Sequence, residues 1–115
     1  MIKRIDSNNG MSRAVVHNGL IYFGGHAAAG KQPTIQEQTK ALLARYDELL
    51  EMNGSDKNHL IFANIYISDM ALKPGMNEIW NAWIEPGNGP ARVTVEAGLD
   101  EGYLIEISII AALNS

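Results

Sequence analysis

Two long β-rich runs, in the middle and at the end of the chain, place the tightest constraint on its fold. Successive side chains of a strand point to opposite faces of a sheet. In the last run, Leu104–Ala112, one face is wholly apolar, whereas the other mixes apolar residues with Glu106 and Ser108. The central run, His59–Ile67, is largely apolar on both faces. We therefore expect helices to cover one face of the sheet and a subunit interface with polar sites to occupy the other.

Two segments have the helical period that would cover the first face. In the first, Thr34 and Glu37 have the spacing of a capping box, and Asn53-Gly54 closes the helix as a left-handed C-cap would. The second helix begins near Pro74, which suits a first turn, and its apolar residues recur at i, i+3, i+4, i+7 and i+8.

The remaining segments add strands to this pattern. Ile2–Ile5 predicts a short first strand, and Asn18-Gly19 between two β-rich runs predicts a hairpin. A β-branched run, Arg92–Ala97, follows the Pro and Gly residues that end the second helix. The order β-β-β-α-β-α-β-β predicts an α+β fold with one mixed, mostly antiparallel sheet and two helices on one face. The length fits a single domain, residues 1–115.

The composition argues against several classes of function. The formal charge of −4 gives no electrostatic footprint for nucleic acid or an anionic membrane. Without cysteine, a disulfide, a thiolate nucleophile and a zinc–thiolate site are excluded, and the three histidines show no metal-ligand spacing. No apolar run approaches the roughly 18 residues of a membrane span, and the first residues do not resemble a signal peptide. We expect a cytoplasmic protein with no metal, nucleic-acid or membrane partner.

Arg92 and Glu106 are the strongest candidates for chemistry. We expect their strands to be antiparallel neighbours, although the loop between them does not fix the register. One interpretation is a cross-strand ion pair, or two solvated charges, without a function. The other is a site in which the planar guanidinium binds a carboxylate and the glutamate orients or deprotonates a water. The residues alone leave both interpretations open.

The segment "MNEIWNAWIEPGNGPARVTVEAGL", followed by "IEISIIAAL", resembles the Rid family of reactive-intermediate imine and enamine deaminases, also called the YjgF/YER057c/UK114 family. The likeness rests on Asn77 in the second helix, on Pro90-Ala91-Arg92 at the mouth of a strand, and on Glu106 in the last strand. It extends over nearly the whole chain, because the order of the elements also matches.

This resemblance implies a chorismate-mutase-like fold and a homotrimer, with three clefts between subunits. It implies that Arg92 binds the carboxylate of a small 2-imino or 2-enamino acid. Glu106 would position the water that attacks the imine carbon. The products would be a 2-oxo acid and ammonia, and no cofactor would be needed.

Part of the expected pocket wall departs from the family pattern. Met11 stands where many members carry tyrosine, Gly24-Gly25-His26 stands where they have Ser-Gly-Gln, and Thr94 stands where cysteine is common. The alternative function is a non-catalytic trimer that binds a 2-oxo acid or a similar carboxylate. The substrate-binding residues implied by the resemblance are Arg92, Asn77, Gly24, His26, Met11 and Thr94.

Overall fold

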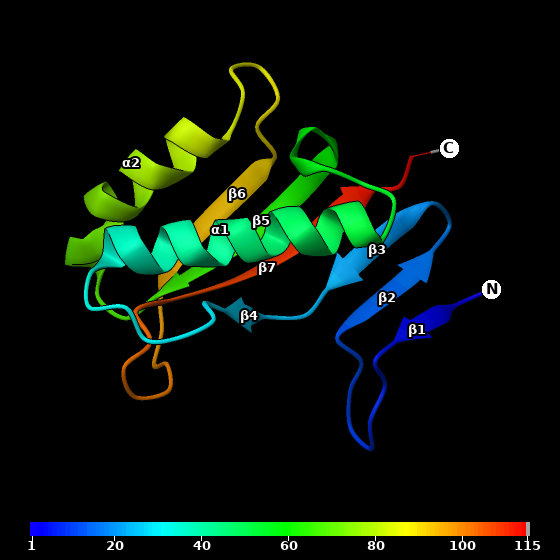
Figure 1. Cartoon of the computed structure of the whole chain (residues 1–115), viewed down its shortest axis with the longest axis horizontal. Coiled ribbons are helices and arrows are strands. Elements are labelled where there is room, and N and C mark those ends of the chain that lie inside the picture. Colours follow the sequence, from blue (N-terminus) through cyan, green and yellow to red (C-terminus); the bar gives the residue numbers. More distant parts are fainter. Residues whose placement is uncertain (115) are drawn as a thin grey trace.

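The computed structural model describes residues 1–114. They form one seven-stranded sheet with both helices packed on the same face (Figure 1). The predicted α+β class and order of elements are confirmed, with one further strand of two residues after the third. The strands are β1 Lys3–Ile5, β2 Ala14–His17, β3 Leu20–Phe23, β4 His26–Ala27, β5 Leu60–Ile67, β6 Ala91–Glu96 and β7 Ile105–Ala112. The helices are α1 Ile35–Met52 and α2 Lys73–Trp83, and the 3₁₀ turns are η1 Lys57–His59 and η2 Met70–Leu72.

Both ends of α1 are capped as the sequence predicts. The Thr34 hydroxyl accepts the backbone N–H of Glu37 at 3.1 Å. At the other end Gly54 has a φ of +77°, and the Ser55 amide donates to the Leu50 carbonyl at 2.9 Å. This is the bonding pattern of a Schellman motif, in which glycine takes the left-handed position without steric cost. The cap turns the chain out of α1 and towards β5.

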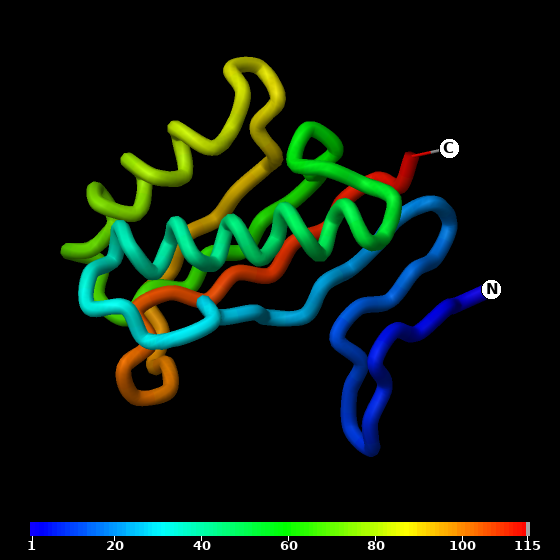
Figure 2. The backbone as a smooth tube through the Cα atoms, viewed as in Figure 1, coloured from blue at the N-terminus to red at the C-terminus, as the bar shows by residue number. Residues whose placement is uncertain are grey.

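The order of strands in the sheet is β1-β2-β3-β7-β5-β6, with β4 paired to β7. The expected pairing of β6 with β7 is therefore wrong, because β5 lies between them. β5 pairs parallel to β6, with Ala63 opposite Arg92, and antiparallel to β7, with Tyr66 opposite Glu106. A parallel pair needs a crossover, which α2 supplies. Figure 2 shows the chain leaving β5, passing through α2 and returning as β6.

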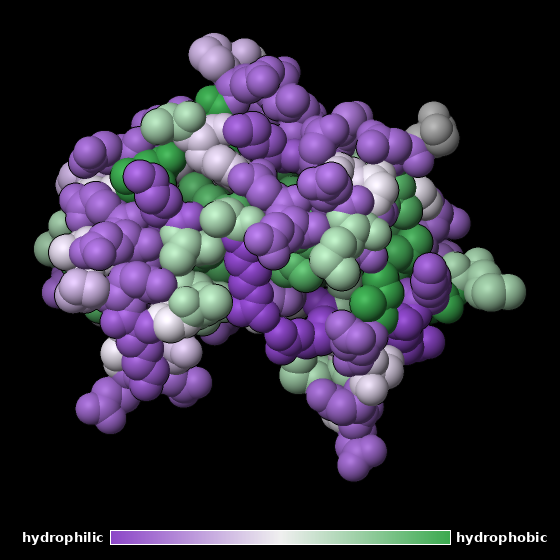
Figure 3. All heavy atoms as spheres, viewed as in Figure 1, coloured by the Kyte–Doolittle hydropathy of each residue, from purple (hydrophilic) through white to green (hydrophobic). Residues whose placement is uncertain are grey.

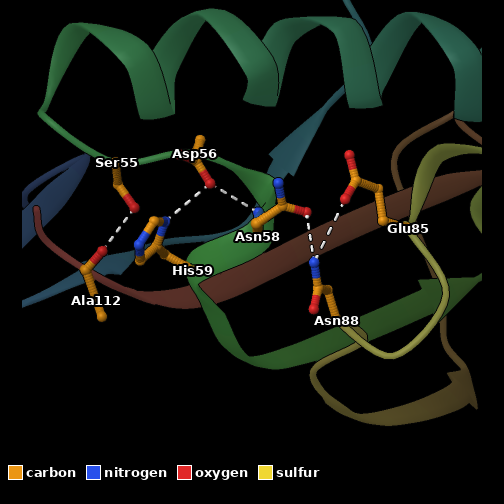
Figure 4. Close-up of polar contacts among 7 residues, drawn as sticks. All are labelled: Ser55, Asp56, Asn58, His59, Glu85, Asn88 and Ala112. Carbon is orange, nitrogen blue, oxygen red and sulfur yellow. Dashed lines mark hydrogen bonds and ion pairs between the residues drawn. The ribbon is translucent and has the colours of Figure 1, made fainter.

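Side-chain hydrogen bonds hold together the connections that lead into β5 and β6 (Figure 4). The Asn88 amide, in the turn before β6, donates to Asn58 Oδ1 at 3.2 Å. Asp56 Oδ1 accepts the backbone N–H of Asn58 at 2.8 Å, and the Ser55 hydroxyl donates to the Ala112 carbonyl at 2.6 Å. Both parallel strands thus start from one cross-linked region, which fixes the point where the chain enters β6.

The helices cover only one face of the sheet. On that face Ile65, Ile67 and Ile107 are fully buried, whereas Val93 and Val95 on the other face are 41% and 38% exposed. Hydrophilic residues dominate the helix side of the molecule, with apolar residues visible over the β2–β3 hairpin (Figure 3). The semi-apolar second face expected from the sequence is present and uncovered.

A β-bulge shifts the register of β5 between Leu60 and Phe62. Leu60 is buried, but Ile61 is 44% exposed. The strand therefore starts its regular alternation only at Phe62.

Among residues 1–114, no helix combines the length and apolar character needed to cross a membrane.

Candidate functional site

Arg92 lies in the edge strand β6 and on the helix face of the sheet, because it is opposite Ala63 in the parallel pair. Its guanidinium carbon lies 5.7 Å from the centre of the Trp80 ring, within the range of a cation–π contact. Partial burial lowers the pKa of Arg92, but the group stays protonated at neutral pH. No carboxylate of residues 1–114 lies within 4.0 Å of it. Within this part of the chain, Arg92 is therefore a partly desolvated cation without an anionic partner.

Two polar groups on this side of the sheet also lack partners. Thr94 Oγ1 and Asn77 Oδ1 are buried and make no hydrogen bond within the described chain. Thr94 follows Arg92 on the same face of β6, and Asn77 lies one helical turn before Trp80 in α2. Buried polar atoms are normally hydrogen-bonded. Arg92 and Thr94 therefore share one face of β6, and Asn77 lies one helical turn from the Trp80 ring that Arg92 contacts.

Glu106 lies on the opposite face of the sheet, beside β4. It borders a pocket of about 280 Å³ formed by the start of β2, by β4, by α1 and by the loop before β7. The pocket is lined by Arg13, Gly25, His26, Ala27, Ala28, Arg45, Leu99, Asp100, Tyr103 and Glu106. Cations, carboxylates and an imidazole therefore surround one cavity. No cation of residues 1–114 lies within 4.0 Å of Glu106.

The wall next to Glu106 depends on the absence of a side chain at Gly25. A Cβ atom at this position would lie 2.9 Å from the Glu106 carboxyl carbon and would overlap its oxygen. A Cβ atom at Gly24 would meet only backbone oxygens at 3.7 and 3.8 Å, which is an ordinary contact distance. Gly25 is thus the glycine that makes room for the carboxylate, and the substrate-binding role of Gly24 stays a prediction.

His26 lies at the floor of this pocket and is only 5% exposed. Its Nδ1–H donates to the Gly24 carbonyl at 2.8 Å. The neighbouring Tyr46 hydroxyl donates to the Ile107 carbonyl at 2.6 Å. Burial lowers the pKa of His26, the bond to Gly24 partly offsets this, and the positive charges of Arg45 and Arg13 lower it further. The imidazole is thus held neutral, while burial raises the pKa of Tyr46.

The predicted site residues therefore fall into two groups within one chain, and Met11 lies apart from both. Arg92 and Glu106 lie on opposite faces of the sheet, and β5 lies between their strands. Their partners in β5, Ala63 and Tyr66, are three residues apart. Strand spacing and rise put the Cα atoms of Arg92 and Glu106 roughly 14 Å apart. Met11 lies in the β1–β2 loop, is 55% exposed and borders a different hollow. A cross-strand ion pair between Arg92 and Glu106 is therefore excluded within one chain, whereas two solvated charges without a function stay an alternative.

Sequence reasoning missed Gly25, Arg13 and Arg45 as parts of the site. Gly25 stands in the Gly24-Gly25-His26 segment that the resemblance to the family pointed to. That resemblance did not show which of the two glycines lies next to Glu106. Arg13 and Arg45 have no local motif and reach the pocket only through tertiary packing.

No group of three His, Asp or Glu side chains suitable for a metal ion occurs within residues 1–114.

Fold and charged groups together define a small single-sheet α+β domain. Among its described residues, the guanidinium on the edge strand and the carboxylate in β7 have no ion-pair partner. The chain belongs to the family described as Endoribonuclease L-PSP, whose model matches residues 1–113. The resemblance to the Rid, or YjgF, family is confirmed by its relatives.

Both curated and solved relatives match nearly the whole chain. A RutC family protein of Haemophilus ducreyi is 35% identical over 115 residues, covering 99% of this chain and 98% of that protein. A crystal structure of a YjgF family member from Neisseria meningitidis is 38% identical, has a TM-score of 0.93, and covers 100% and 97% of the two chains. An Arabidopsis thaliana protein named Reactive Intermediate Deaminase A, chloroplastic, is 30% identical over 109 residues, covering 89% of this chain and 58% of that protein.

The geometry at Gly25 predicts different outcomes for two neighbouring substitutions. In Gly25→Ala the added methyl group should push the Glu106 carboxylate away from β4. In the matched control Gly24→Ala, Glu106 should keep its position, because the new methyl group meets only ordinary contacts. Crystal structures of the two variants measure this, and an unmoved Glu106 in Gly25→Ala would contradict the assignment.

The environment of His26 predicts an acid-sensitive fold. Because the folded state lowers this pKa, the unfolded chain binds the proton more readily below the ordinary histidine pKa of about 6.5. The free energy of unfolding should therefore fall as the pH drops from 7 to 5. Urea unfolding at both pH values should show a smaller decrease for His26→Gln than for the wild type. Equal decreases would show that His26 does not cause the loss.

Proposed function

We propose that this protein hydrolyses small 2-imino or 2-enamino acids to 2-oxo acids and ammonia in a cleft between subunits of a homotrimer. One observation carries the proposal. Within residues 1–114, Arg92 and Glu106 are each free of an oppositely charged partner, and they lie on opposite faces of the sheet. Two such groups suit a site completed by a second copy of the chain better than an internal ion pair.

The uncovered face of the sheet supports an assembly of this kind. It carries apolar residues, including the half-exposed Val93 and Val95, together with Glu106. Burying such a face against another copy removes apolar surface from water. In the same step the Glu106 pocket of one subunit would meet the Arg92 edge of its neighbour. Packing of this sheet face against another copy would thus form both the subunit contact and the site.

The chemistry follows from the two groups. The Arg92 fork holds the substrate carboxylate bidentately, and Asn77 and Thr94 add hydrogen bonds. Glu106 orients a water and takes one of its protons as the oxygen attacks the electrophilic imine carbon. The carbon–nitrogen bond of the resulting carbinolamine then breaks, the nitrogen leaves as ammonia with the protons supplied by the water, and the 2-oxo acid remains.

Non-catalytic binding of a carboxylate is the second candidate. The observation that favours it is that Arg92 and the Thr94 hydroxyl, which have no partners within residues 1–114, can both donate to an anion. A sensor would have no need for Glu106, so the two functions predict different effects of changing that residue.

The names of the relatives also differ, since one is called a deaminase and the family model an endoribonuclease. The absence of nucleic-acid binding stays a prediction from the net charge of −4.

Substitution of the two charged residues tests the function. An amino-acid oxidase would generate imines in situ, and release of the 2-oxo acid would be followed with and without the protein. Glu106→Gln should lower kcat by roughly 10²–10⁴-fold with nearly unchanged ligand affinity, because glutamine cannot take a proton. Arg92→Lys should lower kcat/KM by on the order of 10²-fold, because an ammonium cannot replace the planar fork.

The same variants separate the two candidates. A sensor would bind 2-oxo acids through Arg92 but would give no acceleration over the buffer control. Wild-type turnover in Glu106→Gln would remove the catalytic role assigned to this residue. Melting temperatures of both variants provide the control for folding.

The open face predicts a stable homotrimer. Light scattering coupled to size exclusion should give three times the chain mass at micromolar concentration. Replacing Val95 with lysine puts a charge on the exposed face and should shift the population towards monomers. A wild-type protein that stays monomeric would exclude both the assembly and the shared cleft.

A further inference from the structure

We propose that the Glu106 pocket contains a second anion subsite, formed by Arg45 and Arg13, and that the substrates are 2-imino acids whose side chain carries a second carboxylate. This inference rests on the proposed function, because the first carboxylate is assigned to Arg92. It adds the substrate class, which the family membership does not give.

Arg45 is the inner cation of the subsite. It reaches the pocket from α1 and is partly buried. Its Nη1 donates to the Ala27 carbonyl at 2.9 Å, which fixes the guanidinium against β4. A guanidinium has five N–H donors, so this bond leaves most of them available. A carboxylate in the pocket could accept from the same fork without disturbing the bond to β4.

Arg13 lies at the rim of the same pocket. It immediately precedes β2 and is exposed, and its own carbonyl accepts the Gly24 amide at 3.0 Å. Its backbone is thereby tied to the turn that leads into β4. Neither Arg13 nor Arg45 has a carboxylate within 4.0 Å among residues 1–114. Two arginines on one cavity thus have no counter-ion from the described chain.

The remaining ionisable groups of the pocket do not neutralise the two arginines, so the part of the pocket that would hold the ligand's side chain is positively charged. His26 is held neutral by burial and by the two arginines. Of the two carboxylates, Glu106 is assigned to the attacking water, and Asp100 is exposed on the loop before β7. Solvent screens Asp100 more than the partly buried Arg45.

The subsite would also be close enough to serve the same molecule as Glu106. Ala27, whose carbonyl holds Arg45, is opposite Glu106 in the β4–β7 pair. A ligand whose reacting carbon lies at Glu106 would therefore direct its side chain along β4 towards Arg45. The volume of about 280 Å³ accommodates a side chain of a few atoms and excludes a polymer.

A matched pair of product analogues tests the subsite. 2-Oxopentanedioate and 2-oxopentanoate have the same chain length and differ only in the distal carboxylate. Calorimetric titration of the wild-type protein should show the dicarboxylate binding at least about tenfold more tightly, as expected for a charge-assisted hydrogen bond. In Arg45→Gln and Arg13→Gln this ratio should fall towards one while the affinity for 2-oxopentanoate stays unchanged.

Control variants make the result specific. Lys40→Gln removes the same charge from an exposed position of α1 outside the pocket, and it should keep the wild-type ratio. Melting temperatures check that Arg45→Gln still folds after losing its bond to β4, and Arg13→Gln tests the subsite without touching that bond. Arg92→Gln should weaken both ligands.

Each failure has a distinct meaning. Equal affinities in the wild type, or a preference that survives both Arg45→Gln and Arg13→Gln, would overturn the subsite and leave the proposed function standing. Unchanged binding of 2-oxopentanoate in Arg92→Gln would overturn the assignment of the first carboxylate. If neither ligand binds the wild-type protein, both the proposed function and the subsite are wrong.

Discussion

Strand β5 is hydrogen-bonded along both edges, parallel to β6 and antiparallel to β7, and the positions of the charged groups follow from this double pairing. The parallel partner puts Arg92 beside Ala63 on the helix face. The antiparallel partner puts Glu106 beside Tyr66 on the other face. Because β5 separates them, no change of rotamer within one chain can bring the two charges together.

The local structure could be predicted from the sequence because it depends on local rules. The Asn18-Gly19 turn has positive φ at both residues, as a two-residue hairpin requires. The caps of α1 and the proline in the first turn of α2 are also where their patterns indicate. These features each depend on a few neighbouring residues, so no tertiary context was needed.

The pairing of the last two strands could not be predicted this way. A short Gly-containing connection suggested a hairpin, but the strand–helix–strand order of β5, α2 and β6 favours a right-handed crossover to a parallel neighbour. That crossover places β6 against β5 and leaves β7 for the other edge. The alternation of buried and exposed side chains along β5 was also predicted incorrectly at its start, because the bulge after Leu60 turns Ile61 outward. The same long-range packing brings Arg13 and Arg45 to the pocket, which is why neither carries a signal in the linear sequence.

The position of β6 at the end of the sheet has a consequence for solubility. One side of this six-residue strand offers free backbone N–H and C=O groups next to exposed valines, which is the kind of edge that recruits strands from other molecules. Pro90 precedes it, and Arg92 and Glu96 place charges on it. Charged residues and proline are the usual protection against such edge-to-edge growth. We therefore expect Arg92 to help keep this edge from pairing with other molecules, and a neutral residue in its place to make the protein more prone to aggregation.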